Sequence, residues 1–467
     1  TFTSEGFKRS NVCGQVFWHP QRGLECTIHG DDLLTVCDEA ALAWFDQMVN
    51  KHFLVKQCAV LGPKPTQEKR TSFLNRTIEL VVGKGFVYKP NPKHIDEVVE
   101  ELGLSGCKPM AAPAVRDGGP VLRESAEPLN AQEAAMFARC TGKVVYFSAD
   151  RIECAYVVRL LAQALKTPSQ LDMMRLKHLA KFLKGTRDWC WGYCFQPEVS
   201  TIVGFSDSDW ATCPKTRRSV SCGLVFRGRH YLDGWCSGQQ LVALSSGEAE
   251  FYALGKLVAA LLFVKWLASE MGCELKVIAR SDSSAARGVS LRTGSGPVKH
   301  LEVRFLWIQE RVRAKEVAIE KVAGDANPAD LGTKILTGDR IRQLCGTIGL
   351  GERIWDAVAS HIQLLARART WLVMMALSSL LPCGEAQEVT RLEATDLTLA
   401  ISSEGITLGW GLIAKLLGQA LLIAAENEPL DAWLNAVEVP RPRVSAWGRE
   451  SEDKKLKEQW ELSLIHI

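Results

Sequence analysis

Carboxylates stand at the ends of successive predicted strands and helices between residues 198 and 345, and this pattern constrains the fold of the chain most. The hydrophobic periodicity predicts, in order, strands at 201–206, 219–226 and 231–236, a helix at 246–271, a strand at 276–279, a helix at 299–313, a strand at 317–322 and a helical segment from 325 to 334. Strands that alternate with helices are typical of a sheet with helices packed on it. We therefore expect a mixed α/β domain over residues 198–345.

Four of these elements each supply an acidic residue. The candidates are Asp207 or Asp209 after the first strand, Glu248 or Glu250 in the long helix, Asp282 after the fourth strand and Asp330 at the start of the last helix. Strand ends and a neighbouring helix turn can converge, and clustered carboxylates repel one another unless a cation lies between them. Mg²⁺ (or Mn²⁺) would suit such a cluster, and two ions about 4 Å apart can activate water and stabilise the leaving oxygen of a phosphodiester. Spacing alone is equally compatible with ordinary helix caps and turns.

Five segments of this domain carry a more specific pattern: FSDSDW, ALSSGEAEFYAL, RSDSSAA, KHLEVRF and GDANPADLGTK. In this order and spacing they resemble the RNase H domain of copia-type LTR retrotransposon Pol polyproteins. The resemblance implies an RNase H-like mixed sheet with flanking helices, and it implies that the catalytic, metal-binding carboxylates are Asp207, Glu250, Asp282 and Asp330. Glu250 is preferred because the family's catalytic glutamate precedes an apolar run, as in AEFYAL, which leaves Asp209 and Glu248 in reserve. The residues after Trp210 and the presence of Gly332 depart from the family pattern without removing a carboxylate.

The resemblance extends upstream of this domain. IHGDDLLTV is similar to the metal-binding hairpin of a reverse-transcriptase palm, and the following segments resemble the exit from the palm and the connection to RNase H. Residues 1–115 would then be a truncated palm and thumb, and residues 116–197 a linker and helical connection. By the resemblance Asp31 and Asp32 would lie at a metal site, whereas an isolated pair of this kind is more typical of an acidic turn. We expect polymerisation only with a partner that supplies the missing fingers and palm.

Basic residues near the predicted site are candidates for contact with nucleic acid. An RNA–DNA hybrid would be recognised through phosphates and 2′-hydroxyls rather than bases. The candidates are Arg217, Arg218, Lys299, His300 and Arg304. A single residue of this kind is more often an ordinary solvated surface charge, and the same holds for the basic face predicted for the helix around residues 174–183. With 56 Lys+Arg against 53 Asp+Glu, a contact with the nucleic-acid backbone must come from such local patches.

The remaining composition indicates an intracellular protein of several domains. The 15 cysteines include no C-x-x-C pair, which argues against a structural zinc site and favours reduced thiols in the cytoplasm or nucleus. No signal peptide is visible, and we expect the chain to be a fragment. Residues 346–467 are predicted to be a helical tail without a membrane span, because the apolar run 371–382 is short and Lys415 interrupts 406–425. The final LSLIHI matches a translated library adaptor, so part of the tail is expected to be artefactual.

Two hypotheses follow for function. The first is a retrotransposon-derived fragment with an RNase H nuclease that hydrolyses the RNA strand of RNA–DNA hybrids. The second is a catalytically silent remnant that keeps the fold and binds nucleic acid without metal chemistry. The presence of all four carboxylates favours the nuclease, because charge clustered at one site costs stability unless it serves a cation.

Overall fold

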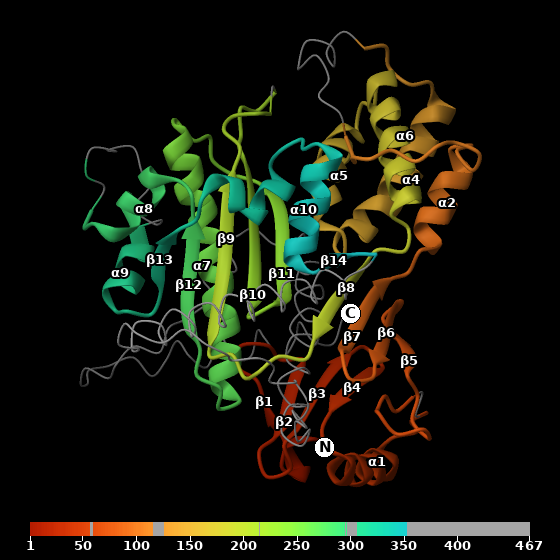
Figure 1. Ribbon diagram of the computed structural model, residues 1–467, viewed down its shortest axis with the longest axis vertical. Helices are drawn as coiled ribbons and strands as arrows, with labels where there is room; N and C mark the ends of the chain where they lie inside the picture. Colours follow the sequence, from red (N-terminus) through yellow and green to blue (C-terminus); the bar gives the residue numbers. More distant parts are fainter. Residues whose placement is uncertain (57–58, 115–125, 214, 295, 297–305, 353–467) are drawn as a thin grey trace, which may run out of the picture. The chain divides into compact units, whose positions relative to one another are not determined.

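The computed structural model describes residues 1–56, 59–114, 126–213, 215–294, 296 and 306–352. These residues form three β-sheets with helices packed against them (Figure 1). The mixed α/β class expected from the sequence is confirmed. The predicted tail and its apolar runs lie outside the described residues.

The first sheet is antiparallel and contains four strands in the order β1-β2-β3-β4. Its strands are β1 (Lys8–Arg9), β2 (Val16–His19), β3 (Leu24–His29) and β4 (Asp32–Val36), preceded by the short helix η1 (Thr3–Glu5) and followed by helix α1 (Glu39–His52). Asp38 caps α1 by accepting a hydrogen bond from the amide of Ala41 at 2.7 Å. Phe45 and Met48 of α1 pack with Phe2 and Leu24 in a separate core.

The second sheet joins segments that are far apart in the sequence. Its order is β14-β8-β7-β6-β5, with β5 (Arg70–Phe73), β6 (Arg76–Val81), β7 (Gly85–Pro90), β8 (Cys190–Cys194) and β14 (Leu350–Gly351). Apolar residues within 76–82 and 85–88 around a Gly-Lys-Gly turn predict a hairpin, and β6 and β7 form it. The sequence does not predict β8 and β14, because both are short and pair with distant strands. Four helices share a hydrophobic core with this sheet: α2 (Lys93–Glu101), α4 (Ala131–Ser148), α5 (Ile152–Ala164) and α6 (Gln170–Gly185).

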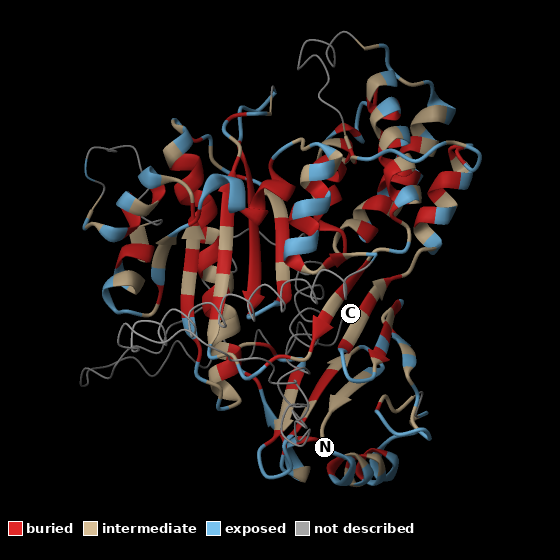
Figure 2. Ribbon diagram, viewed as in Figure 1, coloured by how far each residue is buried: buried red, intermediate tan, exposed pale blue. Residues whose placement is uncertain are grey.

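The third sheet has the order β11-β10-β9-β12-β13. Its strands are β9 (Thr201–Ser208), β10 (Val220–Arg227), β11 (His230–Gly238), β12 (Lys276–Ser281) and β13 (Ala318–Lys321). Strands β9, β10 and β11 are antiparallel, whereas β12 runs parallel to β9 and β13 parallel to β12. This is an RNase H-like mixed sheet, as the resemblance implied. Strand β10 is buried along its whole length (Figure 2).

Helix α7 (Ser246–Glu270) packs on this sheet through β9, β10 and β12. The contact is close because Gly204 in β9 has no side chain, and a Cβ there would lie 2.6 Å from Leu257 of α7. Among the described helices, α7 alone is long and apolar enough to cross a membrane, and most of its apolar stretch is buried inside the protein. That burial is expected for the core helix of a globular domain. At its far end Glu270 accepts hydrogen bonds from the backbone and side chain of Asn11.

The region after β12 differs from the expectation in two places. Helix α8 (Ser284–Leu291) was not predicted, and α9 (Trp307–Arg313) is the described part of the helix expected at 299–313. Residues 325–334 do not open a regular helix but form two short 3-10 helices, η3 (Gly324–Ala326) and η4 (Pro328–Gly332), before α10 (Gly338–Ile348). Asn327 explains the break, because its side chain accepts from the amide of Ala329 and donates to the carbonyl of Ser206, which ties this turn to β9.

Candidate metal centre

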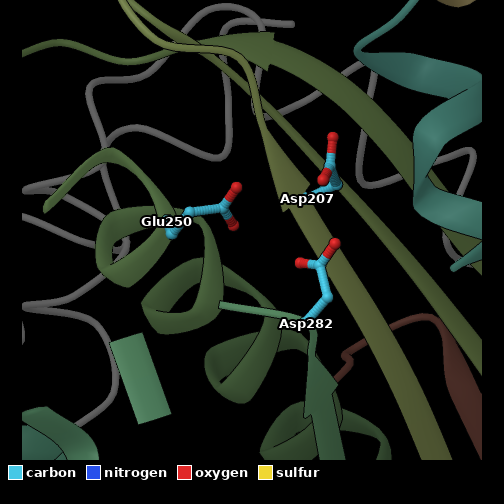
Figure 3. A group of neighbouring side chains, drawn as sticks. All are labelled: Asp207, Glu250 and Asp282. Atoms are coloured by element: carbon cyan, nitrogen blue, oxygen red, sulfur yellow. The ribbon is translucent and has the colours of Figure 1, made fainter. Parts of the chain in front are cut away.

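Three of the predicted carboxylates come together at one edge of the third sheet (Figure 3). One oxygen atom from each of Asp207, Glu250 and Asp282 lies within 4.8 Å of the other two. Asp207 is the penultimate residue of β9 and Asp282 directly follows β12, so the parallel pairing of these strands places both carboxylates at the same edge. Glu250 reaches this edge from the start of α7.

The structure distinguishes Glu250 from its reserve candidate Glu248. Ser245 caps α7 and accepts a hydrogen bond from the amide of Glu248, which makes Glu248 the third residue of the helix. A glutamate at this position can turn back toward the helix N-terminus. The carboxylate of Glu248 does so, accepting from the amide of Leu244 at 2.7 Å and from the hydroxyl of Tyr252. Glu248 therefore stabilises the start of α7 and lies outside the three-carboxylate group.

Asp209, the other reserve candidate, also has a structural role. Its carboxylate accepts hydrogen bonds from the amide of Val220 and from the hydroxyl of Thr212. These contacts hold the loop that leads from β9 to β10. The side chain therefore organises the loop next to the site, and Asp207 is the aspartate that faces Glu250 and Asp282.

Burial and mutual repulsion disfavour negative charge at the centre of this group. Burial, followed by repulsion from Asp207 and Asp282, raises the pKa of Glu250 to about 9. Burial raises the pKa of Asp207 to about 6, although Lys334 and Thr333 work in the opposite direction. Without a cation, Glu250 therefore keeps its proton in the folded protein near pH 7, whereas it would release it in water.

The donor set fits a divalent metal ion. Oε1 of Glu250 accepts from the amide of Ser208 at 3.3 Å, whereas its Oε2 is buried and has no hydrogen-bond partner among the described residues. A buried carboxylate oxygen without a partner costs about 1–3 kcal/mol or more. A cation held by Asp207, Glu250 and Asp282 would remove this cost together with the repulsion, and hard ions such as Mg²⁺ and Mn²⁺ prefer oxygen ligands.

Asp330, the fourth predicted carboxylate, lies beside the group but not in it. It is buried in η4, and its Oδ1 lies 2.5 Å from Nζ of Lys334. The same ammonium group lies 3.4 Å from Oδ1 of Asp207, and the hydroxyl of Thr333 donates to the other oxygen of Asp207. Arg340 of α10 approaches Oδ2 of Asp330 at 3.9 Å. Asp207 is thus shared between the three-carboxylate group and the Asp330–Lys334 ion pair.

The interpretation of the sequence missed Lys334 and Thr333. Both belong to the segment GDANPADLGTK, which was used only for its aspartate. A signal was present, because Lys334 follows Asp330 by four residues, the spacing at which helical side chains meet. The backbone amide of Lys334 donates to the carbonyl of Asp330 at 3.0 Å, so one helical turn does form there.

The predicted nucleic-acid contacts are only partly described. Arg217 and Arg218 are exposed on the loop between β9 and β10, and Arg217 has a left-handed backbone conformation with φ of 54°. Lys299, His300 and Arg304 lie outside the described residues. On the basic face of α6, Lys184 is engaged within the protein, because its ammonium group donates to the carbonyls of Ser105 and Cys107.

The two aspartates of the predicted polymerase site lie apart from this group. Asp31 occupies the turn between β3 and β4, Asp32 begins β4, and both are exposed. Among the described residues they form no group with a third metal-ligating side chain. The structure thus places them as the acidic turn that the isolated pair suggested, in a hairpin like the one that the resemblance implied.

Comparison with known proteins finds similar sequences, although no protein-family model matches the chain. The Retrovirus-related Pol polyprotein from transposon TNT 1-94 of Nicotiana tabacum is 26% identical over 332 residues, which cover 68% of this chain and 24% of that protein. The Retrovirus-related Pol polyprotein from transposon RE1 of Arabidopsis thaliana is 23% identical over 212 residues, or 45% of this chain and 14% of that protein. The curated proteins that this chain resembles are thus Pol polyproteins of copia-type transposons.

The chain spans about a quarter of the length of the tobacco protein. Among solved structures, the foamy viral protease-reverse transcriptase in complex with RNA/DNA hybrid overlaps with a TM-score of 0.33 and 8% identity, covering 55% of this chain and 30% of that one. A TM-score this low is no evidence for a shared fold or ligand. The strand order β11-β10-β9-β12-β13 and the strand directions of the third sheet define the fold of this chain.

Proposed function

We propose that this Pol fragment is a metal-dependent nuclease that hydrolyses the RNA strand of RNA–DNA hybrids. The observation that carries the proposal is the buried Oε2 of Glu250, which has no hydrogen-bond partner among the described residues, in a group with Asp207 and Asp282. A cation held by the three carboxylates would satisfy this oxygen and offset their mutual repulsion. Similarity to the copia-type Pol polyproteins supports RNA–DNA hybrids as the substrate. All thirteen described cysteines are free thiols, which is in keeping with a cytoplasmic or nuclear setting.

Individual residues of the chain would have different roles in this reaction. Asp207, Glu250 and Asp282 would hold divalent metal, which when bound activates water and stabilises the leaving oxygen of a phosphodiester. The amide of Ser208 fixes Oε1 of Glu250 and leaves Oε2 free for the metal. Thr333 orients Asp207 through its hydroxyl. No protein nucleophile is required, and the exposed side chains of Arg217 and Arg218 would contact the nucleic-acid backbone without reading bases.

The test is cleavage of a labelled RNA–DNA hybrid by the complete 467-residue chain in Mg²⁺ or Mn²⁺. The full chain is preferable to residues 190–350, because β8 pairs with β7 and β14 and would lose its partners. We expect Asp282→Asn to reduce cleavage at least about 100-fold, since one metal ligand is lost. Asp339→Asn is the matched control, because Asp339 is an exposed carboxylate of α10 paired only with Arg342.

Two results would oppose the proposal. If wild type and Asp282→Asn cut equally, the activity would belong to a contaminant. If the folded wild type bound the hybrid and cut neither in Mg²⁺ nor in Mn²⁺, the silent nucleic-acid-binding remnant would be the better description. Polymerisation is not proposed for this chain alone, because Asp31 and Asp32 lack a third metal-ligating neighbour among the described residues.

A further inference from the structure

Lys334 occupies the side of the metal centre that faces Asp330. Its ammonium group lies 2.5 Å from Oδ1 of Asp330 and 3.4 Å from Oδ1 of Asp207. We propose that Lys334 is a built-in counter-cation that limits the free protein to one divalent ion, and that a second ion binds between Asp207 and Asp330 only after Lys334 has left them. The inference rests on the proposed metal-dependent function and adds a specific role for one residue to it.

Formal charge supports a single ion in the resting site. The four carboxylates of Asp207, Glu250, Asp282 and Asp330 are contacted by two cationic side chains, Lys334 and Arg340. When all four are ionised, these six groups carry a net charge of about −2, which one divalent ion cancels. A second divalent ion would leave an excess of positive charge in a buried site, which is unfavourable until an anion arrives.

The position of the two partners of Lys334 indicates where that second ion would have to bind. Asp207 already faces Glu250 and Asp282, so an ion held by those three uses one side of its carboxylate. Asp207 also accepts hydrogen bonds from Lys334 at Oδ1 and from Thr333 at Oδ2. A cation bridging Asp207 and Asp330 would have to replace the ammonium group of Lys334, because that group contacts an oxygen of each. An ion in the three-carboxylate group shares only Asp207 with Lys334.

The side chain of Lys334 can also move away from Asp207 and Asp330. Its side chain is 44% exposed, whereas those of Asp207 and Asp330 are 3% and 9% exposed. An ammonium group on a flexible four-carbon stem can turn toward solvent and toward a phosphate at little cost, while the buried aspartates stay in place. The phosphodiester of a bound substrate is an anion of the kind that would draw Lys334 away and tolerate a second divalent ion.

A purely structural role for Lys334 makes the opposite prediction. If the lysine only braced η4 against β9, removing its charge would loosen Asp207 and Asp330 and weaken metal binding. If it is a counter-cation, removing its charge frees two carboxylates and strengthens metal binding. The number of bound ions therefore separates the two roles without any measurement of cleavage.

The experiment measures how many Mn²⁺ ions bind to the full chain without nucleic acid. Equilibrium dialysis gives the stoichiometry, and electron paramagnetic resonance distinguishes free from bound Mn²⁺. We expect about one tight ion per wild-type chain and about two per chain in Lys334→Met, with a magnetically coupled Mn²⁺ pair in the variant only. Lys334→Gln provides a second neutral side chain. Lys334→Arg should restore a stoichiometry of about one, and Lys276→Met, at the exposed opposite end of β12, should leave it unchanged.

Each outcome decides a separate question. One ion in wild type and two in both neutral variants supports the inference. One ion in all variants, or weaker binding in the neutral variants, overturns it and leaves the proposed nuclease intact. Two ions in wild type also overturn it. If wild type binds no ion and Asp282→Asn makes no difference, both the inference and the proposed metal-dependent function fail together.

Discussion

The backbone amide of Ser208, the last residue of β9, donates a hydrogen bond to the carboxylate of Glu250 in α7 at 3.3 Å. This bond crosses from the sheet to its core helix and fixes a charged group where burial opposes charge. Because Oε2 of the same carboxylate has no partner among the described residues, the bond orients Glu250 but does not satisfy it. The stability of the metal-free protein and its affinity for metal should therefore depend on the same residue.

The first prediction concerns Glu250→Gln in the absence of metal. The pKa of Glu250 is about 9 in the folded state and near 4.5 when the chain is unfolded, so the folded state binds the proton more tightly. Below pH 4.5 the Glu250 carboxyl is protonated in both the folded and the unfolded state and does not lower the free energy of unfolding. Between pH 4.5 and pH 9 the unfolded state loses this proton more readily, so the free energy of unfolding falls, and above pH 9 it levels off. A glutamine side chain cannot ionise, so we expect the variant to be more stable than wild type at pH 8 by about 1–3 kcal/mol and equal to it near pH 4.5.

Urea unfolding with a chelator between pH 4.5 and pH 9 measures this difference. Asp339→Asn serves as the control, because its carboxylate is exposed and should not change the pH dependence. Parallel curves for wild type and Glu250→Gln across the pH range would show that Glu250 is not held in a charge-opposing environment.

The second prediction concerns metal and pH together. Divalent metal binds the folded chain through groups that must lose their protons, and the pKa values of Asp207 and Glu250 are raised to about 6 and about 9. Metal binding should therefore strengthen as the pH rises from 6 to 9. We expect saturating Mn²⁺ to raise the thermal transition by about 2–5 °C at pH 8 and by less at pH 6. Asp282→Asn should lose most of this shift, and an equal shift in that variant would place the bound metal elsewhere.

The sequence was most informative where a feature depends on local periodicity. The strands β9, β10, β11 and β12 and the helix α7 were predicted, because each contains a run of apolar residues with the period of its element. Periodicity could not choose between Glu248 and Glu250, and the choice came from the resemblance. The physical reason is visible in the structure, since Glu248 turns back to cap α7 while Glu250 faces β9.

The parts that escaped prediction depend on contacts between distant segments. Strand β8 is only five residues long and is defined by its pairing with β7 and β14, more than 100 residues away on either side. The turn at Asp330 was expected to be helical, but Asn327 bonds to Ser206 and interrupts it. Lys334 then lies between Asp330 and Asp207, which no pattern of neighbouring residues predicts. Long-range hydrogen bonds thus set the site's fourth carboxylate apart from the other three.

The third prediction concerns the buried ion pair of Arg151 and Glu153. Both side chains are fully buried, and the guanidinium also donates to the backbone carbonyl of Thr186 at 3.0 Å and to its hydroxyl at 2.6 Å. Arg151→Met should reduce the free energy of unfolding by about 3–5 kcal/mol, because it leaves the Glu153 carboxylate buried without a partner. The double variant with Glu153→Met should recover part of this loss. Urea unfolding of the two variants and wild type measures it, and an additive loss in the double variant would contradict the pairing.

The fourth prediction tests the distance between β9 and α7. A methyl group at Gly204 would lie 2.6 Å from Cδ1 of Leu257 and 3.0 Å from Cδ1 of Leu261. Because both leucines are fully buried, we expect Gly204→Ala to shift their side chains and to push the helix away from the strand. We expect a loss of about 1–3 kcal/mol in stability. Since Asp207 lies on β9 and Glu250 on α7, Mn²⁺ affinity should fall at least about tenfold as their carboxylates separate.

The matched control for Gly204→Ala is Gly346→Ala in α10. A Cβ at Gly346 meets no atom within 4 Å, and alanine favours a helix, so this variant should gain about 0.5–1 kcal/mol and bind Mn²⁺ as wild type does. Denaturant unfolding and Mn²⁺ titration of both variants provide the two readouts. A Gly204→Ala protein with lower stability but unchanged Mn²⁺ affinity would show that the carboxylate group adjusts independently of the helix–sheet distance, and the rigid placement of Glu250 over Asp207 would have to be abandoned.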